Sequence, residues 1–185
     1  MRPFIQEIQT AHTPESLVAA LGDAPGLVLL RSNLFDSPQA RYSFLAVRPF
    51  LSFRSFGSRC ELRRAEGLCQ VQYGNPWRLL NSLMSRYEVL DELDFPFPLG
   101  GCFGYWGYDL KNFVEPRLPR RAVQDLELPD CHVGFYDSVV VFDHRLERAW
   151  VVSTGLDADG LDLADDPVVL LTGKGGKQRY VPDIG

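Results

Sequence analysis

The stretch Pro98-Leu-Gly-Gly-Cys-Phe-Gly-Tyr-Trp-Gly-Tyr-Asp-Leu110 interleaves glycines with aromatic side chains. Glycine weakens the interior of a strand and commonly marks a bulge, a bend or the close approach of another backbone. Aromatic side chains suit the pleated, half-buried surface of a sheet. We therefore expect a bent inner strand against which another part of the chain packs very closely. Its glycines are Gly100, Gly101, Gly104 and Gly107, and its aromatic residues are Phe103, Tyr105, Trp106 and Tyr108.

This stretch does not match either of the common phosphate-binding loops. Its glycines do not have the G-x-G-x-x-G spacing, and no Lys-Ser or Lys-Thr pair follows the last of them. Asp109 has no partner base near it in the sequence, which makes a catalytic role improbable. The prediction for the glycines, for Tyr108 and for Asp109 is therefore a structural motif.

On both sides of this stretch, short segments that alternate apolar and polar residues are separated by turn residues, a pattern typical of antiparallel sheets. Two helices are predicted from an N-cap residue followed by proline, at Thr13-Pro14 and at Asn75-Pro76. The expected fold class is α+β, with two packed, mainly antiparallel sheets and a few covering helices. The expected strands are 2–9, 27–30, 41–47, 51–56, 59–64, 68–72, 98–108, 138–142 and 149–154, and the expected helices are 14–21, 76–87 and 110–114.

Two of these segments predict which side chains share a face. Strand 41–47 should place Tyr42 and Phe44 on one face and Ser43 on the other, because side chains alternate along a strand. The helix at 76–87 should bury five residues at helical spacing, namely Trp77, Leu80, Leu83, Met84 and Tyr87.

The composition describes an ordinary soluble globular protein of 185 residues, with 45% hydrophobic and 23% charged residues. A net charge of -5 argues against nucleic acid as the main partner. No segment resembles a signal peptide or a membrane span, and the four cysteines and three histidines lack zinc-site spacing. We expect a cytoplasmic protein without a metal or cofactor in this segment and without a membrane partner.

Three blocks of sequence, in order between Leu29 and His144, resemble one enzyme family. They are Leu29-Leu-Arg-Ser32 with Arg41-Tyr-Ser-Phe-Leu45, the glycine stretch Gly100 to Leu110 with Leu118-Pro119, and Leu128-Pro-Asp130 with Gly134-Phe-Tyr-Asp137 and Phe142-Asp-His144. Similar blocks open component I of anthranilate synthase and component I of aminodeoxychorismate synthase (para-aminobenzoate synthase). The chain is identified by this resemblance as the N-terminal domain of such a chorismate-utilising enzyme.

The resemblance implies that this chain is one domain of a larger protein, with catalysis in another domain. Residues 1–155 would be the N-terminal domain, and 156–185 a linker or frayed tail toward a C-terminal chorismate-binding domain that holds magnesium and does the catalysis. The chain by itself should catalyse nothing. Its implied partners are that catalytic domain and a glutamine amidotransferase subunit, and a severed domain is also expected to self-associate through an exposed apolar face.

The resemblance also implies a tryptophan pocket between the two sheets. This pocket is the feedback-inhibition site in anthranilate synthase, and in some aminodeoxychorismate synthases it holds tryptophan as a structural ligand. Carried over by motif, its positions are Leu30, Ser32, Arg41, Tyr42, Ser43 and Phe44. An indole needs aromatic and aliphatic walls, and its polar groups need partners such as a serine hydroxyl and an arginine. Arg41 is equally suited to pair with an acid of the chain itself.

One position departs from the family pattern, because Arg31 replaces the glutamate that precedes the serine. An arginine there would repel a ligand ammonium group. This change favours the aminodeoxychorismate synthase branch, with anthranilate synthase as the alternative. Two further readings are a stand-alone amino-acid-binding module and a structural domain whose pocket is filled by its own side chains.

Overall fold

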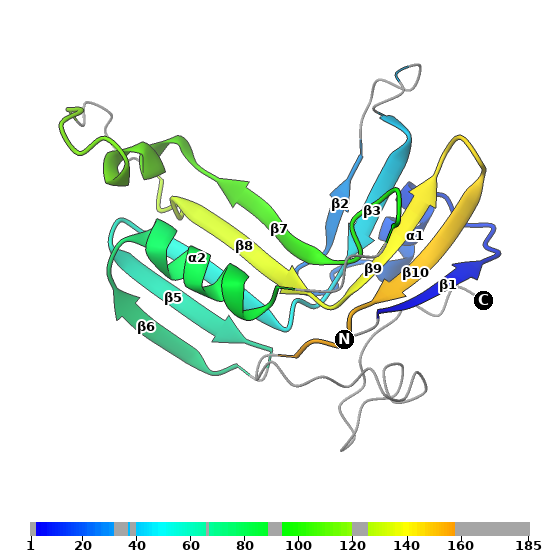
Figure 1. Ribbon diagram of the computed structural model, residues 1–185, viewed down its shortest axis with the longest axis horizontal. Coiled ribbons are helices and arrows are strands. Elements are labelled where there is room, and N and C mark those ends of the chain that lie inside the picture. The colour runs from blue at the N-terminus through cyan, green and yellow to red at the C-terminus, as the bar shows by residue number, and fades with distance from the viewer. Residues whose placement is uncertain are drawn as a thin grey trace. The chain divides into compact units, whose positions relative to one another are not determined.

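In a computed structural model, the strands of the described residues form two five-stranded sheets, one in each of two compact units (Figure 1). The structure describes residues 3–31, 37, 40–65, 67–88, 94–119 and 126–157. One unit takes the described residues of 1–49, 89–101 and 136–185, and the other takes those of 50–88 and 102–135. The units are described one at a time.

Sheet A of the first unit has the strand order β1-β10-β9-β3-β2. Its neighbouring strands pair antiparallel, so that Phe4 faces Ser153 and Tyr42 faces Asp143. The central strand is β9, which includes the strand predicted at 138–142. Its strands are β1 (Phe4–Ile8), β2 (Val28–Leu30), β3 (Tyr42–Ala46), β9 (Ser138–Asp143) and β10 (Arg148–Ser153).

Helix α1 (Pro14–Leu21) packs against one face of sheet A. Its start is the predicted one: the Thr13 hydroxyl accepts from the Ser16 N–H, and Ser16 Oγ accepts from the Thr13 N–H in return. The apolar residues of this core come from the helix and from alternate positions of β3, β9 and β10. They are Leu17, Leu45, Val47, Val140, Phe142, Ala149 and Val151.

Sheet B of the second unit has the strand order β6-β5-β4-β8-β7. Helix α2 (Pro76–Arg86) lies across one face of this sheet (Figure 1), and its Leu80 belongs to the same buried apolar cluster as Phe53 and Val133. The other strands are β4 (Leu51–Phe56), β5 (Arg59–Arg64), β6 (Cys69–Tyr73), β7 (Gly101–Trp106) and β8 (Cys131–Tyr136). Two antiparallel sheets with few helices are the predicted architecture, and the fold class is confirmed.

Strand β7 carries the glycine stretch, and its close approach to β8 is as predicted. A Cβ atom on Gly104 would lie 2.1 Å from the carbonyl oxygen of His132, and one on Gly107 would lie 2.7 Å from that of Asp130. The Gly107 N–H donates to the same Asp130 oxygen at 2.7 Å. The expectation of an inner strand is wrong, because β7 stands at the end of the described sheet B and leaves Tyr105 and Trp106 exposed.

Helix α2 buries only part of the predicted face. Leu80 is buried and Leu83 and Tyr87 pack against the same core, but Trp77 and Met84 are exposed. The short predicted helix at 110–114 is a 3-10 helix, η2 (Tyr108–Phe113), which begins two residues earlier. The indole N–H of Trp77 donates to the backbone oxygen of Leu110 in η2, so that this side chain joins the two helices at the surface.

Candidate functional site

The predicted pocket positions lie on β2 and β3 and do not share one face of sheet A. Leu45 lies in the α1 core, and its neighbours Phe44 and Ala46 point to the opposite face, as does Tyr42. Ser43 therefore points to the α1 side. Leu30 is opposite Phe44 across the β2–β3 pair and is 41% exposed. Ser32 lies outside the described residues.

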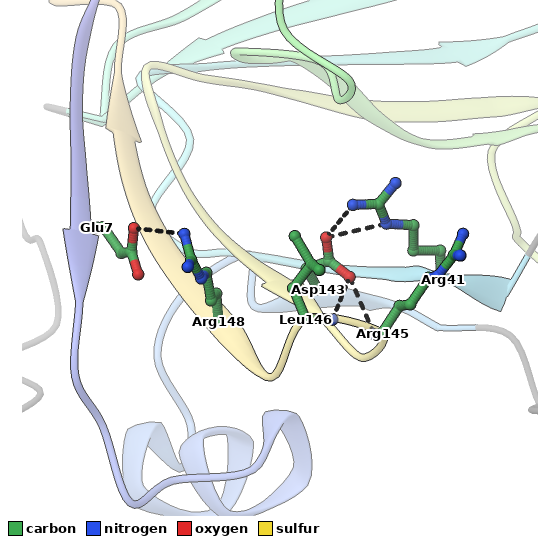
Figure 2. Close-up of polar contacts among 6 residues, drawn as sticks. All are labelled: Glu7, Arg41, Asp143, Arg145, Leu146 and Arg148. Carbon is green, nitrogen blue, oxygen red and sulfur yellow. Dashed lines mark hydrogen bonds and ion pairs between the residues drawn. The ribbon is translucent and has the colours of Figure 1, made fainter.

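Arg41 is engaged by an acid of its own chain, the second of the two roles predicted for it. Its Nε and Nη2 atoms donate to Oδ2 of Asp143 at 2.9 and 2.6 Å (Figure 2). The side chain of Asp143 is 1% exposed. Its other oxygen, Oδ1, accepts from the backbone N–H groups of Arg145 and Leu146 at 2.9 and 3.1 Å. One buried carboxylate thus holds both Arg41 and the turn between β9 and β10.

The electrostatics of this pair follow from its hydrogen bonds. Burial by itself would raise the pKa of Asp143, but the bonds from Arg41, Leu146 and Arg145 and the guanidinium charge outweigh it, so the pKa lies below the ordinary value. The bond to Asp143 in turn raises the pKa of Arg41. Both groups are charged at neutral pH.

Ser43 is also engaged, because its Oγ atom lies 2.7 Å from Nε2 of His144. Partial burial, and next the positive charge of Arg31, lower the pKa of His144. His144 follows the last residue of β9 and lies in a turn. The Asp143-His144 dipeptide therefore binds two of the predicted pocket residues, Arg41 and Ser43. Sequence analysis did not find this pairing.

Arg31 lies on the α1 side of sheet A. Its guanidinium group forms an ion pair with Glu15 of helix α1. The face that carries Tyr42 and Phe44 is the other one, because those side chains alternate with Leu45 of the α1 core. The charge of Arg31 therefore lies on the opposite side of sheet A from Tyr42 and Phe44, where it would not repel the ammonium group of a ligand bound at those rings.

The aromatic face of sheet A, as we call the side opposite α1, holds a continuous group of rings. Tyr42 lies 6.2 Å from Phe44 and 5.6 Å edge-on from Phe97, measured between ring centroids. Phe97 in turn lies 5.3 Å from Trp150 and 5.7 Å from Phe95. The guanidinium carbon of Arg41 stands 4.8 Å over the Tyr42 ring. Sequence analysis missed Phe97 and Trp150, although Trp150 follows the alternation of its strand.

A separate cleft of about 600 Å³ lies between the start of α1 and the β9–β10 turn. Many of its charged groups neutralise one another: Arg31 pairs with Glu15, and Nη1 of Arg148 lies 3.4 Å from Oε2 of Glu7 (Figure 2). Among the predicted pocket positions, none of the described ones lines this cleft. Its chemistry is that of a solvated, ion-paired surface groove.

Tyr108 and Asp109, which belong to the predicted structural motif, follow β7 and lie at the surface. Tyr108 is exposed, and the ammonium group of Lys111 lies 3.7 Å from its ring centroid. Oδ1 of Asp109 lies 4.0 Å from the same ammonium group, and the Asp109 backbone oxygen accepts from the Asn112 side chain. These contacts stabilise the short helix η2.

Across 3–31, 37, 40–65, 67–88, 94–119 and 126–157, no three side chains among His, Cys, Asp and Glu gather in a way that could hold a metal ion. In the same part of the chain, no helix has both the length and the apolar character needed to cross a membrane.

Comparison with curated proteins finds two groups of relatives. The chain is 31% identical to "Anthranilate synthase component 1" of Acetivibrio thermocellus, over 76% of this chain and 28% of the relative. It is also 31% identical to "Aminodeoxychorismate synthase component 1" of Escherichia coli K12, over 75% of this chain and 30% of the relative. The chain thus spans less than a third of the length of these relatives. No protein-family model matches.

Comparison with solved structures finds the same fold. Anthranilate synthase component I from Streptococcus pneumoniae TIGR4 superposes with a TM-score of 0.54 and 24% identity, over 83% of this chain and 33% of that structure. At this identity the likeness concerns the architecture of the chain.

Proposed function

Since this chain is a homologue of part of the component 1 proteins of anthranilate synthase and aminodeoxychorismate synthase, we propose that it forms the non-catalytic N-terminal domain of a chorismate-aminating component 1. The whole enzyme would convert chorismate and ammonia into 4-amino-4-deoxychorismate. A glutamine amidotransferase subunit would supply the ammonia. Magnesium and chorismate would bind in a separate catalytic domain.

The single observation that carries this proposal is the similarity of three quarters of the chain to less than a third of each relative. Such a match is expected when one domain of a larger enzyme is compared with the whole.

The choice of product rests on the aromatic face of sheet A. A feedback-inhibited enzyme of tryptophan synthesis needs a site that is open to free tryptophan. Here Tyr42 is packed against Phe97, which is 7% exposed. This closed arrangement favours the aminodeoxychorismate branch, whereas Arg31 supports it less than expected because its charge is paired with Glu15 on the α1 side.

Anthranilate synthase component 1 is the second candidate, because relatives of both names match at the same 31% identity. It differs in the position of amination and in the elimination of pyruvate. The two products separate readily by chromatography, and anthranilate is fluorescent.

The test combines this chain, in one polypeptide or in two, with a chorismate-binding catalytic domain of the family, chorismate, magnesium and ammonium. We expect 4-amino-4-deoxychorismate when both domains are present and no product from this chain alone. Anthranilate as the product would establish the second candidate. Turnover by this chain alone, or undiminished turnover without it, would contradict the proposed role.

A further inference from the structure

We propose that the aromatic face of sheet A is a slot for one planar ring that the chain fills with its own Phe97, so that it excludes free aromatic amino acids. The slot follows from ring contacts within one unit of the structure. The ligand class that it excludes, an aromatic amino acid, rests on the proposed function. The proposal therefore concerns how that domain is regulated.

The walls of the slot come from strands that are far apart in the sequence. Trp150 of β10 is opposite Val141 of β9, which is opposite Phe44 of β3. These three side chains form one row across the sheet, with a small residue between two rings. Tyr42 extends the wall by one position along β3, and its ring contacts that of Phe44.

Phe97 bridges this row. Its ring lies edge-on to Tyr42 at 5.6 Å and tilted against Trp150 at 5.3 Å, so that it contacts strands β3 and β10 at once. These are the separations and orientations that aromatic pairs favour. Phe97 is 7% exposed, although its neighbours Pro96 and Pro98 are exposed. The ring is therefore inserted while the backbone beside it stays at the surface.

The segment that carries Phe97 is anchored close by. A Cβ atom on Gly100 would lie 3.0 Å from Cγ2 of Thr154 and 3.6 Å from the backbone oxygen of Tyr136. Pro96 and Pro98 restrict the backbone on both sides of Phe97. This close packing three residues away holds the ring at the slot with little freedom to withdraw.

The cation that an amino acid carboxylate would need is also occupied, although the buried Tyr42 hydroxyl has no hydrogen-bond partner. Arg41, which stands over the Tyr42 ring, gives two hydrogen bonds to the buried Asp143. A ligand carboxylate would have to break this pair and leave Asp143 without its cation, which is costly for a buried carboxylate. The slot and its cation are therefore both taken by the chain itself.

Calorimetric titration with L-tryptophan and with indole tests the proposal. The wild-type chain should bind neither at millimolar concentration. The Phe97→Ala variant should bind indole in a saturable manner, since an apolar cavity the size of a ring accepts small aromatic molecules. Phe95→Ala is the matched control, because Phe95 is 41% exposed and contacts the cluster at its rim, and it should bind neither ligand.

Saturable binding of L-tryptophan by the wild-type chain would overturn the proposal, and so would a folded Phe97→Ala variant that binds no indole. If Phe97→Ala does not fold, the titration of the wild-type chain with L-tryptophan decides: saturable binding overturns the proposal, and no binding at millimolar concentration supports it. These titrations contain no chorismate. A failure of the proposed enzyme role therefore appears in the product assay alone, and a failure of the self-filled slot appears in the titrations alone.

Discussion

At the scale of single residues, the carboxyl group of Asp143 connects parts of sheet A that are distant in the sequence. It accepts from Arg41, which is 102 positions away, and from the N–H groups of Arg145 and Leu146 in the next turn. The residue is 2% exposed. A buried carboxylate with this many donors is a stabilising element because each donor would otherwise lose its hydrogen bond to water on burial.

The Asp143→Asn substitution tests this role with little change in volume. The amide cannot accept at both former oxygen positions and does not neutralise Arg41. We expect the free energy of unfolding in urea to fall by about 2 to 4 kcal/mol. Asp109→Asn is the control, because Asp109 lies 4.0 Å from Lys111 at the surface and should change stability by less than about 0.5 kcal/mol. Equal effects of the two substitutions would refute the role of Asp143.

The contribution of Asp143 should also depend on pH. Its pKa is lower in the folded chain than in the unfolded one, so the unfolded state takes up the proton first as the pH falls. The stabilisation is therefore complete above the unfolded pKa of about 4 and is lost as the pH falls through the folded pKa. The difference in unfolding free energy between wild type and Asp143→Asn should be constant near neutral pH and shrink below about pH 4. A difference that grows on acidification would contradict this assignment.

At the scale of elements, the pairing of β7 with β8 depends on glycine at two positions. Gly104 has a φ of +154° and no room for a Cβ atom beside His132. Both the backbone conformation and the contact with a carbonyl oxygen disfavour any other residue there. The glycines of this stretch thus allow the close pairing of β7 with β8, as the composition of the stretch indicates.

The Gly104→Ala substitution should destabilise this strand pair. A methyl group 2.1 Å from the His132 oxygen forces β7 away from β8, and we expect a loss of about 3 kcal/mol in thermal unfolding followed by circular dichroism. Gly74→Ala is the matched control in the same unit, since its Cβ would meet only Cδ1 of Leu79 at 3.8 Å. A Gly104→Ala variant as stable as Gly74→Ala would show that the close approach does not contribute to folding.

At the scale of the whole molecule, the described parts of residues 105–128 in the second unit carry several large apolar side chains that are exposed. These residues are Tyr105, Trp106, Tyr108, Val114, Leu118, Leu126 and Leu128. Large exposed apolar patches on soluble chains commonly mark interaction surfaces. This segment begins within β7, which stands at the end of sheet B in the described part of the chain.

We expect the isolated chain to self-associate through this segment. Sedimentation velocity should show an association that weakens by about tenfold or more when Tyr108 and Leu118 are both replaced by serine. Val71→Ser is the control, because Val71 is similarly exposed but lies on β6. A clean monomer at high protein concentration would contradict the expectation.

The sequence by itself determined every described strand except β8, both helix starts, the face alternation of β3, the close approach at Gly104 and the family. These features depend on neighbours within a few residues or on short motifs, so they can be read along the chain. Only the tertiary structure decided that Arg41 pairs with Asp143, that Phe97 lies between Tyr42 and Trp150, and that β7 stands at an edge. Those contacts join segments up to 102 positions apart, and they exist only once strand order has placed β3 beside β9 and β9 beside β10.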